Sequence, residues 1–372
     1  MAYGSINADV IGTSVQGYSL GAGNSSLLKN KIINGAMVIS QRYGTTATAN
    51  TINDYTLDRW SATQYPSTGK IIVQQNAGSV TPPAGFSNYL GVTSQSAYSI
   101  GTSDFYMLQQ PIEGYNIADL GFGTANAKTV TLSFQVYSSL TGTFGGALRG
   151  PQNYPFTYSI PVANTWTPIS VTVAGSTSGS WATNNAAGLT VCFGLGVGST
   201  YSATAGSWTN SNIISATGAT SVVGTNGATF YITGVQLEVG SSATGFEYVN
   251  YQTSLANCQR YYYKIKPSAL NLSFSTGGQA YASSNTIAWI PFPVTMRIAP
   301  TALEQSGTAS DYKVWGASGS GITLTSVPSF NGATNFNVAS VDCPVTTGLT
   351  AGNASTLLSN STNAYLGWSA EL

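Results

Sequence analysis

The side chains best suited to bond-breaking chemistry in this sequence are two pairs of carboxylates. Asp54 lies four residues before Asp58, and Glu113 lies six residues before Asp119. Two carboxyl groups can hydrolyse a glycosidic bond when they are about 5 to 9.5 Å apart. In a β-strand, residues four apart face the same side at a separation of about 13 Å, so only a loop could bring such a pair close enough. We interpret these acids as solvated or ion-paired, with polysaccharide cleavage as the alternative.

The residue types that support most other enzymatic sites are scarce. The chain has no histidine, which excludes Ser-His-Asp and Cys-His nucleophiles, an imidazole base and histidine metal ligands. Its three cysteines, Cys192, Cys258 and Cys343, form no CxxC motif, so we interpret them as buried free thiols. The dispersed acids give no support to a calcium site. The sequence therefore predicts a protein that is not an enzyme and that needs neither a metal nor a cofactor.

Charge is the most unusual property of the composition. The 372 residues include 12 Lys and Arg and 12 Asp and Glu, which is 6% of the chain, whereas about 25% is usual in a soluble domain. A neutral chain without basic clusters displaces few counterions, which argues against binding nucleic acid or anionic lipid. No apolar run reaches the ~18 residues of a membrane span, and no basic residue precedes Lys29. We expect synthesis in a cytoplasm, without export and without membrane insertion.

Alternation of apolar and polar residues, which is typical of strands buried on one face, recurs from Lys31 onward. The strands predicted from it cover residues 70–75, 105–112, 129–137, 154–162, 169–173, 189–197 and 229–238. In residues 189–197 the second face is nearly all small, so another layer can approach it closely. No amphipathic helix of ten or more residues interrupts these strands. The pattern predicts an all-β chain with an antiparallel jelly roll or β-sandwich.

The same pattern predicts the domain organisation. Residues 1–30 form an extended arm, residues 31–250 the jelly-roll domain, residues 251–266 a linker with a short helix, and residues 267–372 a second, smaller β-sandwich domain. Tryptophans in strand-like runs are expected in the cores, and these are Trp60, Trp166, Trp289 and Trp368. The other core positions expected in the last domain are Ile287, Phe292, Val294, Ile322, Leu324, Phe336 and Val338.

Saccharide binding without catalysis requires an aromatic face for the sugar ring and neutral hydrogen-bonding side chains. The long loops at residues 175–188 and 198–227 each carry one tryptophan among Ser, Thr and Asn, including the run from Gly206 to Asn212. A second aromatic candidate occurs in the last domain. The candidate glycan-binding residues are therefore Trp181, Trp208, Tyr312 and Trp315. The alternatives are tryptophans folded back over a sandwich edge in the loops, and a contact between copies of a trimer in the last domain.

Three groups of motifs resemble a family of bacteriophage fibre and receptor-binding proteins. The first is KIINGAMVISQR at residues 31–42 followed by YTLDRW at residues 55–60. The second is GVQLEVG at residues 234–240, ATGFE at residues 243–247 and CQRYY at residues 258–262. The third is MRIAPT at residues 296–301 with the terminal SAEL. Together these motifs bracket most of residues 31–372.

The resemblance implies a structural virion protein with a carbohydrate-binding-module-like jelly roll, a C-terminal β domain and a trimeric assembly. The expected function is that of a phage tail fibre, which attaches the virion to a glycan or receptor on the host surface without catalysis. Residues 1–30 would then bind other virion proteins. A capsid decoration or head-fibre protein is the first alternative, and a polysaccharide depolymerase is the second. The resemblance supplies no mapped sugar site.

The few charged residues inside these motifs have a physical interpretation of their own. An unpaired buried charge costs several kcal/mol, so a charge that persists in such a chain is expected to be paired or to bind backbone groups. We therefore predict structural roles for Arg42, Asp58, Arg59, Trp60, Glu238 and Arg260.

Overall fold

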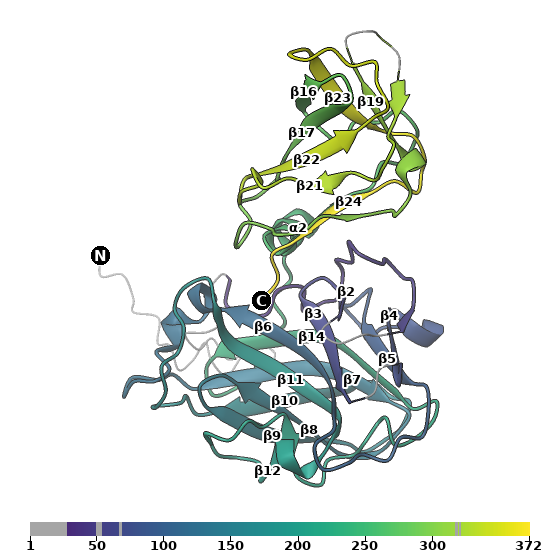
Figure 1. The fold of residues 1–372 in the computed structure, drawn as a ribbon. Coiled ribbons are helices and arrows are strands. Elements are labelled where there is room, and N and C mark those ends of the chain that lie inside the picture. The colour runs from purple at the N-terminus through teal and green to yellow at the C-terminus, as the bar shows by residue number, and fades with distance from the viewer. Residues whose placement is uncertain (1–27, 50–53, 67–68, 317–318, 320) are drawn as a thin grey trace, which may run out of the picture. The chain divides into compact units, whose positions relative to one another are not determined.

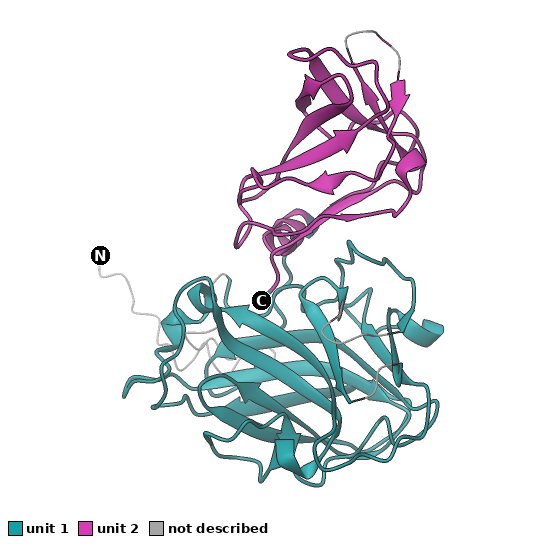
Figure 2. Cartoon of the chain, viewed as in Figure 1, with its two compact units in different colours: residues 1–251, 372 teal, residues 252–371 magenta. Residues whose placement is uncertain are grey.

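The computed structural model describes residues 28–49, 54–66, 69–316, 319 and 321–372, which form two compact units (Figure 2). The first unit ends at Tyr251 and also includes Leu372, and the second comprises Gln252–Glu371. Most of the arm predicted at residues 1–30 lies outside the described residues. Of the helices in the described part, none is long and apolar enough to cross a membrane.

The first unit is built from two six-stranded sheets in which neighbouring strands are antiparallel (Figure 1). One, here called the β7 sheet, has the order β1 (Thr48–Ala49), β4 (Ile71–Gln75), β5 (Leu90–Ser94), β14 (Thr229–Val239), β7 (Val130–Ser138) and β10 (Thr167–Val173). The other, the β11 sheet, has the order β2 (Asp54–Leu57), β3 (Trp60–Tyr65), β6 (Phe105–Glu113), β11 (Ala187–Val197), β8 (Gly142–Arg149) and β9 (Asn153–Ile160).

The core of this unit lies between the two sheets because alternation turns one side of each strand inward. The Phe134 ring on β7 lies 5.0 Å from the Phe193 ring on β11 and 5.1 Å from the Tyr158 ring on β9, measured between centroids. Trp60 on β3 is fully buried and adds to the same cluster. The predicted all-β sandwich is thereby confirmed, and the seven strands expected from periodicity correspond to β4, β6, β7, β9, β10, β11 and β14.

The small outer face of β11 is covered, as its composition predicted, but by the same chain. The segment between β11 and β14 carries two short parallel strands, β12 (Ser202–Ala203) and β13 (Ser215–Ala216). Ile214, which precedes β13, is buried against Met107 and Cys192 on the outer side of the β11 sheet. The part of this face around Cys192 is therefore occupied within one chain.

Helices are few and short in the described part of the chain. The predicted linking helix is α2 (Tyr251–Gln259), and its Cys258 is buried. The 3₁₀ turns are η1 (Ala77–Ser79), η2 (Gly114–Asn116), η3 (Ala118–Leu120), η4 (Ser199–Tyr201) and η5 (Ala309–Asp311).

The second unit contains two further antiparallel sheets around a separate core. The smaller sheet has the order β15 (Tyr262–Ile265), β24 (Leu366–Ser369) and β18 (Glu304–Gln305). The larger has the order β20 (Gly321–Thr323), β19 (Tyr312–Trp315), β23 (Ala354–Ser359), β16 (Gly277–Ala282), β17 (Asn285–Pro291), β22 (Val338–Pro344) and β21 (Ser329–Phe330).

Three aromatic residues expected in the cores lie elsewhere. Trp289 on β17 is 42% exposed, because its neighbours Ala288 and Ile290 take the inward positions and alternation leaves it outside. Phe336 is exposed in a bend before β22, where strand alternation does not apply. Trp166 is half-buried on the outer face of the β7 sheet, in a cluster with tyrosines. Phe292, Leu324 and Trp368 are buried, whereas Ile287, Val294, Ile322 and Val338 are half-buried.

This difference predicts unequal losses of stability in the second unit. We expect Trp368→Ala to lower its free energy of unfolding by about 3 to 5 kcal/mol, because it opens a cavity in the core. The matched change Trp289→Ala, on the surface, should cost about 1 kcal/mol or less. Urea unfolding of the two variants checks this, and equal losses would contradict the assignment of the two faces.

Candidate functional site

The two loop tryptophans predicted to bind glycan meet inside the first unit. Trp181 and Trp208 pack edge to face with ring centroids 5.7 Å apart, and the Phe122 ring contacts both. Their indole N–H groups donate to the carbonyl oxygens of Ser178 and Ala174, at 2.9 and 2.8 Å. Trp181 is only 8% exposed. Both rings therefore act as anchors that fix the loops, as in the alternative of tryptophans folded back over the sandwich.

The loop around Trp208 is also fixed to β9. The backbone N–H groups of Asn153 and Thr209 each donate to the other residue's carbonyl oxygen, at 2.8 and 2.9 Å. The Asn153 side chain donates to the carbonyl oxygen of Ser211 at 2.9 Å. Trp208 therefore fixes one side of the loop, and the pairing with Asn153 fixes the other. The two asparagines of the loop, Asn210 and Asn212, are held beside the end of β8.

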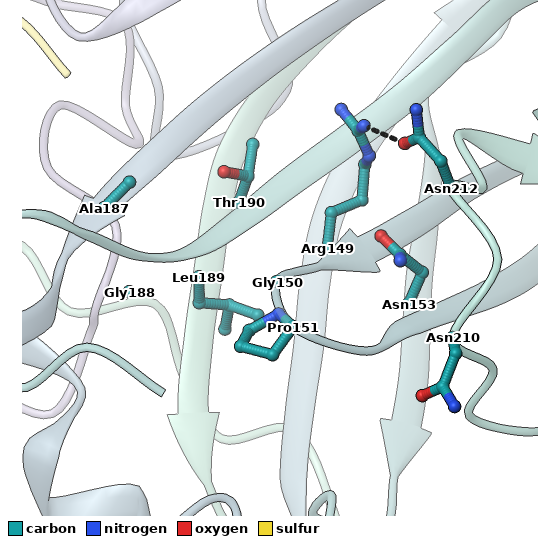
Figure 3. A pocket seen from close by; sticks show the side chains of 10 residues that line it. All are labelled: Arg149, Gly150, Pro151, Asn153, Ala187, Gly188, Leu189, Thr190, Asn210 and Asn212. Carbon is teal, nitrogen blue, oxygen red and sulfur yellow. Dashed lines mark hydrogen bonds between the residues drawn. The ribbon is translucent and has the colours of Figure 1, made fainter. Parts of the chain in front are cut away.

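These elements enclose a pocket of about 400 Å³ on the outer side of the β11 sheet, here called the β8–β11 pocket (Figure 3). One wall comes from the end of β8 and the turn that follows it, another from the start of β11, and a third from the loop. The residues that line it are Arg149, Gly150, Pro151, Asn153, Ala187, Gly188, Leu189, Thr190, Asn210 and Asn212.

Arg149 supplies the only charged side chain of this lining. Its Nη2 donates to Asn212 Oδ1 at 2.6 Å, as Figure 3 shows, and its Nη1 lies 4.0 Å from Cys192 Sγ. The Nε is buried and has no hydrogen-bond partner among the described residues. The described residues also provide no carboxylate ion pair for this guanidinium. The cation is thus oriented by an amide and keeps unused donor capacity.

The neutral side chains of the pocket also keep free hydrogen-bonding groups. Asn212 Oδ1 is used by Arg149, and Asn210 Oδ1 accepts from Gln152 Nε2 at 3.1 Å. The Nδ2 groups of both asparagines and the hydroxyl of Thr190 make no hydrogen bond with any described residue. The pocket therefore presents several neutral donors and one guanidinium to a ligand, which suits an array of hydroxyl groups.

The thiol behind this pocket is not a nucleophile. Cys192 is fully buried, and burial raises the pKa of its thiol, although the Arg149 guanidinium lowers that pKa in part. A thiol whose pKa is raised stays protonated at neutral pH, and the thiolate is the reactive form. Cys258 and Cys343 are likewise buried.

The second predicted aromatic pair does not form one surface. Tyr312 is fully buried, and its hydroxyl donates to the Tyr365 carbonyl oxygen at 2.6 Å and accepts from Ser306 N–H at 3.0 Å. Trp315, three residues along the same strand, has the opposite parity and is 47% exposed. Of these two residues, only Trp315 presents a ring to solvent.

Three of the residues assigned structural roles in the sequence lie where β2 turns into β3, at one edge of the β11 sheet. Asp58 is buried and accepts from Gln41 N–H at 2.8 Å, and Arg59 Nη2 donates to the Pro111 carbonyl oxygen at 2.5 Å. The Trp60 indole donates to the Asn34 carbonyl oxygen at 3.2 Å.

The three other residues of that set contact aromatic or polar partners. The Arg42 guanidinium lies 5.3 Å from the centroid of the Tyr55 ring. Glu238 is fully buried and accepts from the N–H and the hydroxyl of Thr244 at 2.8 and 2.6 Å. In the second unit, Arg260 Nη1 lies 3.4 Å from the Thr295 carbonyl oxygen.

The predicted acid pairs are placed as follows. Asp119 is ion-paired with Lys31 at 2.8 Å, whereas Glu113 is buried at the end of β6. The side chain of Asp54 lies outside the described part of the structure. Within the described ranges, no three His, Cys, Asp or Glu side chains gather as metal ligands would.

Sequence reasoning identified the loop from Gly206 to Asn212 but missed Arg149, Asn153 and Thr190. The sequence did offer one signal for Arg149. It is one of only 12 cationic residues, and it directly precedes a Gly-Pro dipeptide. Thr190 was recognised only as part of the small face of β11. Its position in a pocket depends on the loop that crosses above it, which strand periodicity does not reveal.

No protein-family model matches this chain, and no curated protein matches it. Among solved structures, it is similar to the enzymatically active domain of bacteriophage CBA120 tailspike protein 4, with 14% identity, a TM-score of 0.31, and coverage of 57% of this chain and 22% of that chain. It is also similar to a family 11 carbohydrate-binding module from Clostridium thermocellum, with 11% identity, a TM-score of 0.27, and coverage of 54% and 98%. It is similar as well to the CBM22-1 xylan-binding domain from Paenibacillus barcinonensis, with 10% identity, a TM-score of 0.27, and coverage of 54% of this chain and 99% of that chain.

Proposed function

We propose that the β8–β11 pocket binds a saccharide of a bacterial surface polysaccharide. The observation that carries this proposal is the set of unused donors on the terminal nitrogens of Arg149, the amides of Asn210 and Asn212 and the hydroxyl of Thr190, residues that all line one hollow. Sugar hydroxyls are both donors and acceptors, so a ring can satisfy several of these groups at once. The loop is fixed before binding by Trp208, which reduces the entropy lost on complex formation.

On this basis the chain acts as a phage tail fibre, a structural protein of the virion that is made in the host cytoplasm and attaches the particle to the host surface. The family resemblance of residues 31–60 and 234–262 supports this assignment. The arm at residues 1–30 would bind other virion proteins. A capsid decoration protein would carry the same pocket and differ in where this arm docks.

Recognition without catalysis is part of the proposal. The lining of the pocket contains no carboxylate, whereas glycoside cleavage uses two. The adjacent thiol is held protonated, and the chain has no histidine to act as a general base. The residues around the ligand can therefore position a sugar but have no group suited to proton transfer at neutral pH.

The binding proposal predicts the effect of removing the loop amides. We expect the double variant Asn210→Ala, Asn212→Ala to weaken binding to an array of bacterial surface polysaccharides about tenfold or more, since each neutral hydrogen bond contributes about 1 kcal/mol. The control is Asn126→Ala, which removes an exposed amide outside the pocket. Undiminished binding by the double variant would exclude this pocket as the site. Reducing sugars released from the bound polysaccharide would show that the chain is a depolymerase.

A homotrimeric assembly is proposed for the second unit, which has an outer sheet face poor in charge. Tyr281, Trp289 and Trp315 are each about half exposed on the larger sheet. The Asp342 carboxylate on this face accepts from the side chains of Tyr281 and Asn331, at 3.3 and 2.9 Å. Aromatic surface with few charges can meet an identical copy without like-charge repulsion.

Averaged electron micrographs of assembled particles test where this chain lies on the virion and how many copies of it each fibre contains. We expect threefold-symmetric fibres on the tail, with density for three copies of the last domain. Density on the capsid would instead identify a decoration protein. Single copies on the tail would contradict the trimer but not the attachment function.

A further inference from the structure

A second pocket, of about 380 Å³, opens on the outer side of the β7 sheet and is here called the β7–β10 pocket. Ser133 and Gln135 on β7 and Ser170 on β10 line it. Their inward neighbours belong to the core, so alternation turns these three side chains to the outer face. None of the three makes a side-chain hydrogen bond with any described residue. Their hydroxyl and amide groups are therefore available to a ligand.

The other wall of this pocket is aromatic. Phe86, Phe246 and Tyr248 contact one another, with ring centroids 5.0 to 5.8 Å apart. Tyr248 is 63% exposed, so much of its side chain is open to solvent. Gly234 has a φ of +62° at an irregularity of β14, and a Cβ there would lie 2.5 Å from Phe86 Cζ. The glycine thus permits the close approach of Phe86 to the sheet.

A buried polar network fixes the segment that carries Phe246 and Tyr248. Both oxygens of the Glu238 carboxylate are bound by Thr244, and Gln236 Nε2 donates to the same carboxylate at 2.8 Å. Gln236 Oε1 in turn accepts from Glu247 N–H at 2.8 Å. The Glu247 carboxylate accepts from Asn30 N–H at 2.8 Å. The aromatic wall is therefore held in place before a ligand arrives, which lowers the entropy cost of binding.

The lining identifies the class of ligand. It contains no Asp, Glu, Lys or Arg, so an ionic ligand would lose hydration without gaining a counter-charge. It combines an exposed aromatic ring with neutral donors and acceptors, and a sugar ring has an apolar face together with peripheral hydroxyls. An apolar peptide would leave the free groups of Ser133, Gln135 and Ser170 unsatisfied.

We propose that the β7–β10 pocket is a second saccharide-binding site, specific for neutral sugars. It shares with the proposed function only the class of ligand, because its lining residues belong to the β7 sheet and its loops, whereas the β8–β11 pocket lies on the β11 sheet. Sites on opposite faces of one sandwich engage separate points of a polysaccharide. Simultaneous engagement makes the second binding event intramolecular and raises the avidity for a surface coated with polymer.

The test uses saturation-transfer difference NMR on the full chain, with cellohexaose, xylohexaose and mannohexaose as neutral probes and a hexamer of galacturonic acid as the charged probe. Each is added to the Asn210→Ala, Asn212→Ala chain, in which binding to the first pocket is weakened. We expect at least one neutral probe to receive saturation in that chain. Adding Tyr248→Ala should reduce the signal at least fivefold, and adding Gln135→Ala should reduce it at least twofold.

The control is Tyr115→Ala, which removes an equally exposed tyrosine (61%) outside both pockets and should leave the signal unchanged. Three outcomes would overturn the proposal: no transfer to any neutral probe in the chain that lacks the two loop amides, a signal insensitive to both Tyr248→Ala and Gln135→Ala, or preferential binding of the galacturonic acid hexamer. Failure of the proposed function is distinct, because it appears as unchanged polysaccharide binding on removal of the loop amides alone.

Discussion

The aromatic contact between the two six-stranded sheets is the interaction on which the rest of the first unit depends. Phe134 of the β7 sheet contacts Phe193 and Tyr158 of the β11 sheet. Phe230, also on the β7 sheet, contacts Phe193 as well. Each such pair contributes about 0.5 to 1.5 kcal/mol beyond the apolar area that it buries. Because the inward positions are committed to this core, alternation sends the polar residues of both sheets outward. The two pockets are built from those outward residues and from the loops that cross them.

Scarcity of charge shapes how the molecule satisfies its buried polar atoms. Asn34 is one example: its amide oxygen accepts from two backbone N–H groups, and its amide nitrogen donates to the carbonyl oxygens of Ile39 and Asp58. Buried Glu238 persists because hydrogen bonds from Thr244 and Gln236 surround its carboxylate and the Lys29 ammonium lies 3.7 Å from it. Elsewhere the same neutral groups are left without partners, and they gather in hollows. An incomplete set of hydrogen bonds at the surface is what distinguishes the two proposed binding pockets from the interior here.

The strands could be predicted from the sequence, but the side of the sheet on which a single aromatic residue lies was harder to predict. The alternation in residues 129–137 and 189–197 located β7 and β11 because each has one consistently apolar side. The same rule failed for Trp289, whose inward neighbour positions hold the smaller Ala288 and the aliphatic Ile290. Trp181 and Trp208, predicted as candidate glycan-binding residues, anchor the loops beside a pocket that other side chains line. Arg149 and Thr190 could not be recognised from spacing, because the loop that closes over them is about twenty residues from Thr190 and about sixty from Arg149 in sequence.

Recognition by neutral hydrogen bonds and aromatic faces, with one guanidinium at most, is the central claim of this account. The most direct measurement is the dissociation constant for a bound bacterial polysaccharide at 50 mM and at 500 mM NaCl. Screening acts on charge–charge contacts and leaves neutral hydrogen bonds and stacking nearly unchanged. We expect the dissociation constant to change by less than about threefold. A loss of affinity of more than about tenfold would show that ionic contacts dominate and would contradict it.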